Sequence, residues 1–144
     1  MFSKTCEYAI RALIFIAHRS RQGAKTGIKE IATGIDAPES FIAKILHELG
    51  KKGLVQSFKG PAGGFFLDEL ALQHTLADIV KAVDGDHIFS GCGLGLRDCS
   101  ERKPCPIHHQ FKKIRMDIYN LLQNARLDEM QAQLETKLLF LKQR

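Results

Sequence analysis

Three cysteines and one histidine lie within a short, glycine-rich part of the chain. Cys92, Cys99, Cys105 and His108 follow the pattern Cys-x6-Cys-x5-Cys-x2-His. Thiolates and imidazole are ligands of zinc and of iron–sulfur clusters. The wide spacings suit a loop wrapped around a cluster and do not match the closely spaced cysteine pairs of zinc knuckles. We therefore expect an iron–sulfur cluster with three thiolate ligands and one other ligand.

Three other interpretations stay open: a zinc site with three cysteines and one histidine, a disulfide between two of the cysteines, and unliganded thiols. His109 adjoins His108, which has the better position, one helical turn after Cys105. Cys6 lies beside the apolar face of the first expected helix, so we interpret it as a small buried hydrophobic residue. Because the apolar residues 12–17 are not followed by a small-residue cleavage site, we expect the protein in the cytoplasm.

The composition is that of an ordinary folded protein. The chain has 144 residues, of which 44% are hydrophobic and 26% are charged. This size fits one domain, or one domain with an appendage. The formal net charge of +5 permits a nucleic-acid partner, and residues 1–29 are the most basic part. No apolar run approaches the roughly 18 residues that a membrane helix needs, so we expect no membrane partner.

The N-terminal part of the sequence predicts two helices. Apolar residues recur three and four positions apart over residues 3–19, which gives one buried helical face. A polar segment with two glycines follows at residues 20–27 and is expected to be a loop. A short second helix is predicted over residues 28–35, with its end near Gly34.

A third helix is predicted over residues 38–52. Asp36 is positioned to accept hydrogen bonds from its first free amides, Pro38 is tolerated in the first turn, and Gly53 is a natural end. Two short helices joined by a tight turn, the second of them amphipathic, form a candidate helix-turn-helix unit.

Two strand-like runs at residues 54–58 and 65–67 enclose a glycine-rich turn at residues 59–64. A helix-turn-helix followed directly by such a hairpin is a winged helix. In these folds the N-terminal part of the second helix enters the major groove of DNA, and a turn with few side chains lets the backbone approach closely. The residues that we expect at the DNA are Lys4, Lys29, Glu39, Ser40, Ala43, Lys44, Lys59, Gly60, Pro61, Gly63 and Gly64.

The C-terminal part predicts further helices around the cysteines. Thr75 and Asp78 resemble a capping box at the start of a fourth helix, which ends at residues 84–86. Residues 85–106 are expected to form a long loop, and loops of this length are usually functional. A fifth helix over residues 106–123 carries a heptad seam of apolar residues. The seam consists of Ile107, Phe111, Ile114, Ile118, Leu121 and Ala125.

A last helix is predicted from Leu127 onward, with apolar positions at Met130, Leu134, Leu138 and Leu141. Either this helix covers the heptad seam, or two copies of the fifth helix pack together in a twofold dimer. The dimer would place two recognition helices about one DNA turn apart, and its operator would be a near-palindrome.

The predicted protein is mainly α-helical with a small β-hairpin. Residues 1–84 form a winged helix-turn-helix DNA-binding domain, residues 85–106 a cysteine-rich cluster-binding loop, and residues 107–144 the dimerisation helices. The alternative function is a winged-helix regulator with structural zinc or thiol-based sensing and no cluster. A winged-helix module that binds protein and carries structural zinc is a further alternative. A thiol oxidoreductase is disfavoured because the sequence lacks a Cys-x2-Cys motif, so we expect no enzyme.

The chain resembles the IscR/NsrR/CymR-type winged-helix regulators of bacteria. The likeness covers essentially the whole chain, and four stretches and the cysteine loop carry it. The stretches are residues 7–13 (EYAIRAL), 49–54 (LGKKGL), 58–65 (FKGPAGGF) and 77–84 (ADIVKAVD). The resemblance implies a homodimeric transcription factor that binds double-stranded DNA, with a dimerisation helix after the cysteine loop.

The same resemblance implies a [2Fe–2S] cluster. Cys92, Cys99 and Cys105 match the cysteine ligands of the family. His108 matches the fourth ligand of IscR-like members, whereas Glu7 stands where NsrR-like members supply an acidic ligand from the partner subunit. The sequence offers both fourth ligands and does not choose between them.

Two departures from the family pattern limit what carries over. The gap between Cys92 and Cys99 is one residue longer than in IscR-like members. Ala43 stands where IscR-like recognition helices can carry a glutamate that helps to select the DNA site. Neither the signal sensed nor the operator therefore follows from the resemblance.

Overall fold

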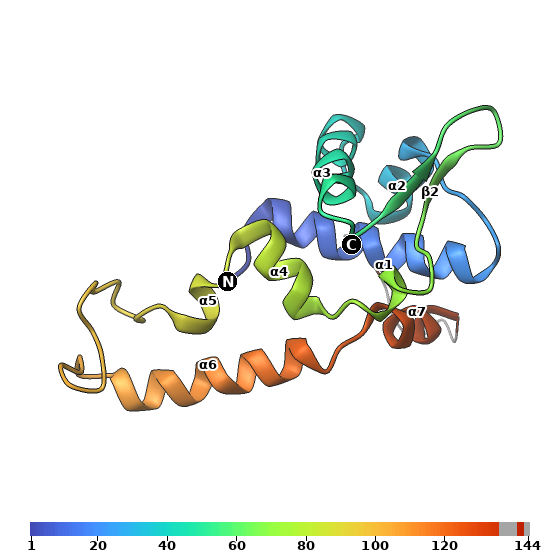
Figure 1. The fold of residues 1–144 in the computed structure, drawn as a ribbon. Helices are drawn as coiled ribbons and strands as arrows, with labels where there is room; N and C mark the ends of the chain where they lie inside the picture. Colours follow the sequence, from blue (N-terminus) through green and yellow to red (C-terminus); the bar gives the residue numbers. More distant parts are fainter. Residues whose placement is uncertain (136–140, 143–144) are drawn as a thin grey trace.

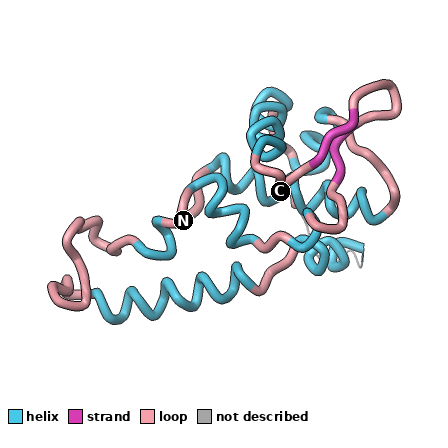
Figure 2. Tube along the Cα trace, in the orientation of Figure 1, coloured by secondary structure: helices cyan, strands magenta, loops and turns pink. Residues whose placement is uncertain are grey.

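The computed structural model describes residues 1–135 and 141–142 of the chain. A long first helix, α1 (Lys4–Arg21), runs through the middle of the N-terminal part, and α2, α3, α4 and α7 all contact it (Figure 1). In the described residues the only strands are those of one small hairpin, so the chain is mainly helical as predicted (Figure 2).

The start and the apolar face of α1 follow from its sequence. Ser3 caps the helix by accepting a hydrogen bond from the backbone N–H of Cys6. Leu13 and Ile16 are fully buried and face the other helices, which places the core along this helix. Cys6 is also 0% exposed, which confirms that it is a core residue.

The helix-turn-helix consists of α2 (Ile28–Ile35) and α3 (Glu39–Lys51). The predicted bounds of α2 are confirmed: the helix ends at Ile35, next to Gly34, where an added Cβ would collide with the ring of Phe15. One prediction about the turn was wrong. Asp36 does not cap α3; it adopts the left-handed conformation (φ 52°) as the C-cap of α2, and Pro38 stands at the N-cap of α3.

The hairpin pairs β1 (Gln56–Phe58) with β2 (Gly64–Phe66) in antiparallel register. A second antiparallel bridge joins Thr26 to Phe65 through hydrogen bonds of 2.9 and 2.8 Å between their backbone groups. The hairpin is therefore attached to the segment that leads into α2.

A short 3-10 helix, η1 (Ala71–Gln73), precedes α4 (Leu76–Asp84). Thr75 and Asp78 form both hydrogen bonds of the predicted capping box. The segment expected to be a loop contains one short helix, α5 (His87–Ser90), which the sequence pattern did not predict. Phe89 of this helix packs edge-on against the ring of Tyr119, at 5.2 Å between ring centroids.

The long helix α6 (His108–Gln123) contacts α4 and α5 and carries the cysteine segment at its N-terminal end (Figure 1). Helix α7 (Leu127–Glu135) packs against α1 and η1. Of the predicted last helix, Leu138 lies outside the described residues, and Leu141 is described but not helical. In the described part of the chain, no helix is long and apolar enough to span a membrane.

Candidate metal centre and nucleic-acid interface

The three cysteines of the segment before α6 converge on one point. The sulfur atoms of Cys92, Cys99 and Cys105 all lie within 4.8 Å of one another, and those of Cys92 and Cys105 are 3.7 Å apart. A disulfide would bring two sulfur atoms to about 2.05 Å, and all three cysteines are free thiols. The predicted loop therefore brings residues 13 positions apart in sequence into one cluster.

His108, the first residue of α6, lies beside one of the three cysteines. Its Nδ1 atom lies 3.2 Å from Cys99 Sγ, and its side chain is only 9% exposed. The adjacent His109 is exposed, which agrees with the preference for His108. The structure thus brings the three predicted cysteines together and places His108 beside Cys99.

The backbone of the cysteine segment is arranged around the sulfur atoms. Backbone N–H groups of Leu96 and Leu94 point to Cys92 and stabilise its thiolate, which lowers the pKa of Cys92 to about 7. The N–H of Cys105 likewise favours the thiolate of Cys99, but burial and the neighbouring thiols outweigh it and raise the pKa of Cys99. Of the two, Cys92 is the thiol that ionises first.

Glu101 is a member of this site that the sequence pattern did not predict. Its carboxylate lies 3.2 Å from His108 Nε2 and forms an ion pair with Lys112. Lys112 first, and His108 second, lower the pKa of Glu101 to about 2. The only sequence signal was the spacing of His108 and Lys112, four positions apart on one helix face.

The donor set fits a thiolate-rich metal centre. Zn–S bonds of about 2.3 Å and Zn–N bonds of about 2.0–2.1 Å in a tetrahedral site place ligand atoms roughly 3.3–3.8 Å apart. The separation of 3.7 Å between the sulfur atoms of Cys92 and Cys105 lies in that range, and the 3.2 Å between Cys99 Sγ and His108 Nδ1 is slightly shorter. Glu7 does not join this group in its own chain; it lies in the first turn of α1 and pairs with Lys4 at 3.3 Å.

The predicted DNA-contacting residues of α3 and the hairpin lie far from the thiols (Figure 1). Helix α3 buries Ile42, Ile45, Leu46 and Leu49 in the core. Its other face exposes the predicted contacts. Of these, Glu39, Ser40 and Lys44 are exposed and Ala43 is partly buried.

The hairpin tip has the backbone geometry that requires glycine. Gly60 and Gly64 have φ angles of 115° and 147°, and a Cβ on Gly64 would lie 2.8 Å from the backbone nitrogen of Thr26. Lys59 and Pro61 are exposed at the tip. The hairpin thus projects beside α3 with little side-chain bulk.

The sequence matches the Rrf2 family, described as iron-dependent transcriptional regulators, over residues 2–133. The chain belongs to the Rrf2 family. It is 33% identical over 142 residues to an Aquifex aeolicus protein assigned as an HTH-type transcriptional regulator, covering 97% of this chain and 96% of that protein. It is 27% identical over 128 residues to NsrR of Oceanobacillus iheyensis, covering 88% and 86%.

Solved structures of Rrf2-family proteins share this fold. CymR of B. subtilis, the global cysteine regulator, aligns with a TM-score of 0.75 at 22% identity, over 92% of this chain and 97% of that one. IscR of T. potens aligns with a TM-score of 0.72 at 21% identity, over 96% and 91%. The winged-helix prediction is confirmed, and this Rrf2-family chain is a transcriptional regulator rather than an enzyme.

Part of the basic N-terminal segment of this Rrf2-family regulator is neutralised by internal ion pairs. Arg21 pairs with Glu69 at 3.1 Å and with Asp128 at 2.7 Å. Lys29 is exposed, and so is Lys4 beside Glu7. The positive charge of residues 1–29 therefore serves internal contacts in part, which the sequence count did not reveal.

Proposed function

We propose that this protein is a cytoplasmic, homodimeric DNA-binding regulator whose operator affinity depends on a [2Fe–2S] cluster. Cys92, Cys99, Cys105 and His108 would hold the cluster. The observation that carries the proposal is the convergence of the three sulfur atoms, with His108 Nδ1 3.2 Å from one of them, at the N-terminal end of α6. When bound, the cluster supplies iron that responds to redox conditions, iron supply or nitric oxide. Relatives named NsrR and IscR support this assignment.

Packed helices connect the cysteine segment to the DNA-binding helices. Arg115 of α6 donates a hydrogen bond to the carbonyl of Gly91, directly before Cys92. Helix α6 contacts α5 and α4, α4 contacts α1, and α1 contacts α2 and α3. An ordered cysteine segment therefore holds α5 against α6. Because α6 also contacts α4, a change in this segment can shift α4. A coupling of about 1–3 kcal/mol between cluster and operator would suffice for a gene switch.

The DNA-reading surface consists of the exposed face of α3 and the hairpin. We assign base-edge contacts to Ser40 and Lys44, since a hydroxyl and an ammonium group can bond base edges or phosphates. Lys59 approaches the phosphate backbone from the start of the turn that joins β1 to β2. We keep the remaining predicted residues as further DNA contacts: Lys4, Lys29, Glu39, Ala43, Gly60, Pro61, Gly63 and Gly64.

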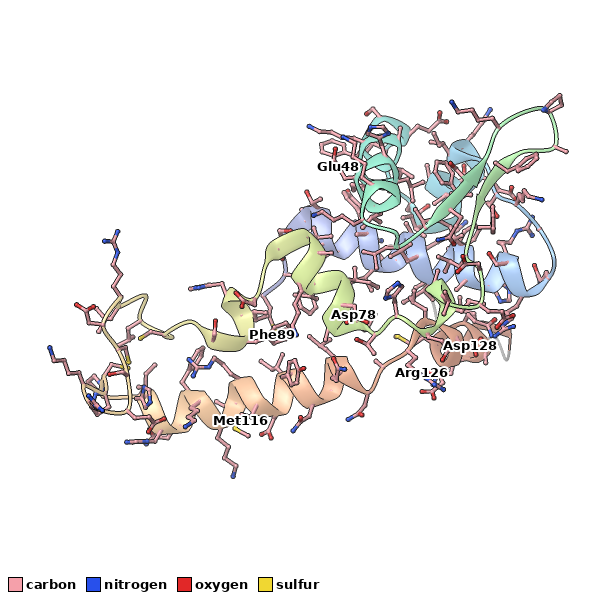
Figure 3. All side chains as sticks on the ribbon, in the orientation of Figure 1. Glu48, Asp78, Phe89, Met116, Arg126 and Asp128 are labelled. Atoms are coloured by element: carbon pink, nitrogen blue, oxygen red, sulfur yellow. The ribbon has the colours of Figure 1, made fainter. Side chains whose placement is uncertain are left out.

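The heptad seam of α6 is the proposed dimer interface. Ile114 and Leu121 are 52% and 67% exposed, although Ile118 packs against the core. Helix α7 contacts α1 and η1, which leaves these two seam residues open. Figure 3 shows Phe89 on the side of α6 that α5 covers. We therefore keep the division into a DNA-binding domain (1–84), a cluster loop (85–106) and dimerisation helices (107–144).

Anaerobic reconstitution with iron and sulfide, followed by visible absorption and iron and sulfide analysis, tests the cluster. Wild type is expected to hold two irons and two sulfides per subunit. Substitution of any of the three cysteines by alanine should abolish the signal, with folding checked by circular dichroism. His108→Ala should weaken the signal, and His109→Ala is the matched control. If Glu7→Ala abolishes the cluster and His108→Ala does not, the fourth ligand is the partner's Glu7.

The regulatory claim needs a second measurement. Operator DNA selected from random sequence should bind with different affinities to cluster-loaded and cluster-free protein, by about 5- to 150-fold. Equal affinities would contradict the proposed regulation even if the cluster forms. Retention of one zinc per subunit, with no visible absorption after reconstitution, would instead favour the structural-zinc alternative.

A further inference from the structure

We propose that Glu101 is the positioning residue of this centre: its carboxylate holds the Nε2 proton of His108, so that Nδ1 is the nitrogen presented to the metal. The inference rests on the proposed cluster function and deepens it. It concerns a residue of the cysteine segment that the sequence pattern did not single out.

The two nitrogens of His108 face different partners. Nε2 lies 3.2 Å from Glu101 Oε1, and Nδ1 lies 3.2 Å from Cys99 Sγ. A neutral imidazole carries one N–H group and one lone pair, and a carboxylate can only accept. The proton therefore belongs on Nε2, and the lone pair of Nδ1 points to the sulfur cluster.

Glu101 is itself held in place. Lys112 forms an ion pair with the same carboxylate oxygen that His108 contacts. His108 and Lys112 are one helical turn apart on α6, so both reach the carboxylate from one face. The Glu101 side chain is 58% exposed, whereas that of His108 is 9% exposed. The carboxylate thus covers the ring on its solvent side, opposite the thiols.

A carboxylate behind a ligating histidine has two effects. It fixes the tautomer and the ring orientation, and it makes the coordinating nitrogen a stronger donor. Loss of such a partner commonly weakens metal binding by about 10- to 100-fold. Because a stronger donor favours the oxidised metal, removing the negative charge is expected to raise the reduction potential.

The first test uses the cluster-free protein. In protein labelled with ¹⁵N in histidine, NMR should show His108 of the wild type as the Nε2–H tautomer. Glu101→Ala should produce a mixture of tautomers, and Glu101→Gln, which keeps an acceptor, should restore the Nε2–H form. Asp98→Asn is the matched control: it removes an exposed carboxylate of the same segment that forms no ion pair in the described residues.

The second test uses reconstituted protein. Glu101→Ala should lose its cluster to a chelator about 10- to 100-fold faster than Asp98→Asn does. Glu101→Gln should keep the nitrogen hyperfine coupling of His108 in the reduced cluster but have a more positive midpoint potential.

The outcomes separate this inference from the proposed function. If wild type assembles no cluster, the proposed function fails, and the tautomer measurement alone decides the role of Glu101. If wild type shows a cluster with the His108 nitrogen coupled to it, and both Glu101 variants match Asp98→Asn in tautomer, chelator resistance and potential, the role of Glu101 is overturned while the cluster stands.

Discussion

Asp84, the last residue of α4, accepts a hydrogen bond of 2.9 Å from the backbone N–H of Ser3 and another from the Ser3 hydroxyl group. The hydroxyl oxygen of Ser3 in turn accepts a hydrogen bond of 3.0 Å from the backbone N–H of Cys6. One carboxylate therefore joins the end of α4 to the start of α1. It lies where the path from the cysteine segment enters the DNA-binding part.

Replacing Asp84 by alanine should lower the free energy of unfolding by about 1–2 kcal/mol, because it removes two hydrogen bonds to a charged group at an exposed site. Urea denaturation followed by circular dichroism measures this change. Asp86→Ala is the control, since the Asp86 side chain makes no hydrogen bond or ion pair in the described part of the chain. Equal denaturation midpoints for the two variants would contradict the role of Asp84.

Gly64→Ala should destabilise the protein by about 1–3 kcal/mol. The position has a φ angle of 147°, and the new Cβ would lie 2.8 Å from the backbone nitrogen of Thr26. The contact is with backbone, which cannot rotate away. Gly50→Ala has the opposite expectation, because Gly50 lies inside α3 with no atom closer than 3.9 Å to the new Cβ. Thermal denaturation should show a lower Tm for the first variant and an unchanged or higher Tm for the second.

The cysteines of cluster-free protein should react with iodoacetamide at different pH values. Cys92, with a pKa of about 7, should be half-maximally reactive near neutral pH. Cys99, whose pKa is raised, should need higher pH, and buried Cys6, with a pKa of about 12, should react only on unfolding. Peptide mapping by mass spectrometry separates the sites. Equal rates for Cys92 and Cys99 at pH 7 would contradict the assigned backbone hydrogen bonds.

The lowered pKa of Cys92 also determines how the free energy of unfolding changes with pH. Its folded-state pKa of about 7 lies below the ordinary value of 9.0, so folding favours the thiolate. The resulting stabilisation is present above the unfolded-state pKa and disappears as pH falls from about 9 through 7. Unfolding of the cluster-free wild type and of Cys92→Ala, compared at pH 6 and pH 9, should show a larger difference at the higher pH.

A charge in the seam of α6 should disrupt the dimer. Ile114→Glu places a carboxylate on an apolar position that is 52% exposed in the single chain. Analytical ultracentrifugation should show wild type as a dimer and this variant as a monomer or a much weaker dimer, because burying an unpaired charge is costly. Met116→Glu adds the same charge to α6 at an exposed position outside the seam and should leave the dimer intact. A dimer that withstands Ile114→Glu would place the interface elsewhere.

The affinity for DNA should fall as the salt concentration rises. Lysine and arginine side chains that contact phosphates displace counterions from the DNA, and added salt opposes this release. Lys59→Ala should weaken binding to all sequences and reduce the salt dependence by about one ion, whereas Ser40→Ala should change the preference among sequences. Lys113→Ala, an exposed lysine of α6 away from α3, is the control. Fluorescence anisotropy with specific and scrambled duplexes measures all three. An unchanged salt dependence in Lys59→Ala would exclude a phosphate contact at the wing.

Periodicity and local motifs predicted most of the fold. The apolar spacing of α1, the capping box at Thr75 and Asp78, and the glycine-rich hairpin all appear as expected. Two features differ from the prediction. Asp36 ends α2 in the left-handed conformation instead of capping α3. The unpredicted helix α5 packs Phe89 against a ring from a later helix, a contact that local sequence patterns do not reveal.

The cysteine spacing predicted which side chains meet but not what surrounds them. Backbone N–H groups of Leu94 and Cys105 point to sulfur atoms, and such directions depend on loop conformation rather than residue type. Glu101 was missed because a single loop carboxylate has no periodic signal. Its partner Lys112 is recognisable only once His108 is placed at the start of a helix.

The candidate ligands lie on both sides of the boundary between the cysteine segment and α6. Cys92 and Cys99 come from the segment, and His108 is the first residue of the helix whose later side chains face outward. Losing the metal would therefore loosen the first turn of that helix as well as the loop before it. If two copies pair along this helix, metal loss in one subunit would alter a helix that contacts the partner subunit. A dimer with metal in only one subunit would then be a third state with its own affinity for DNA.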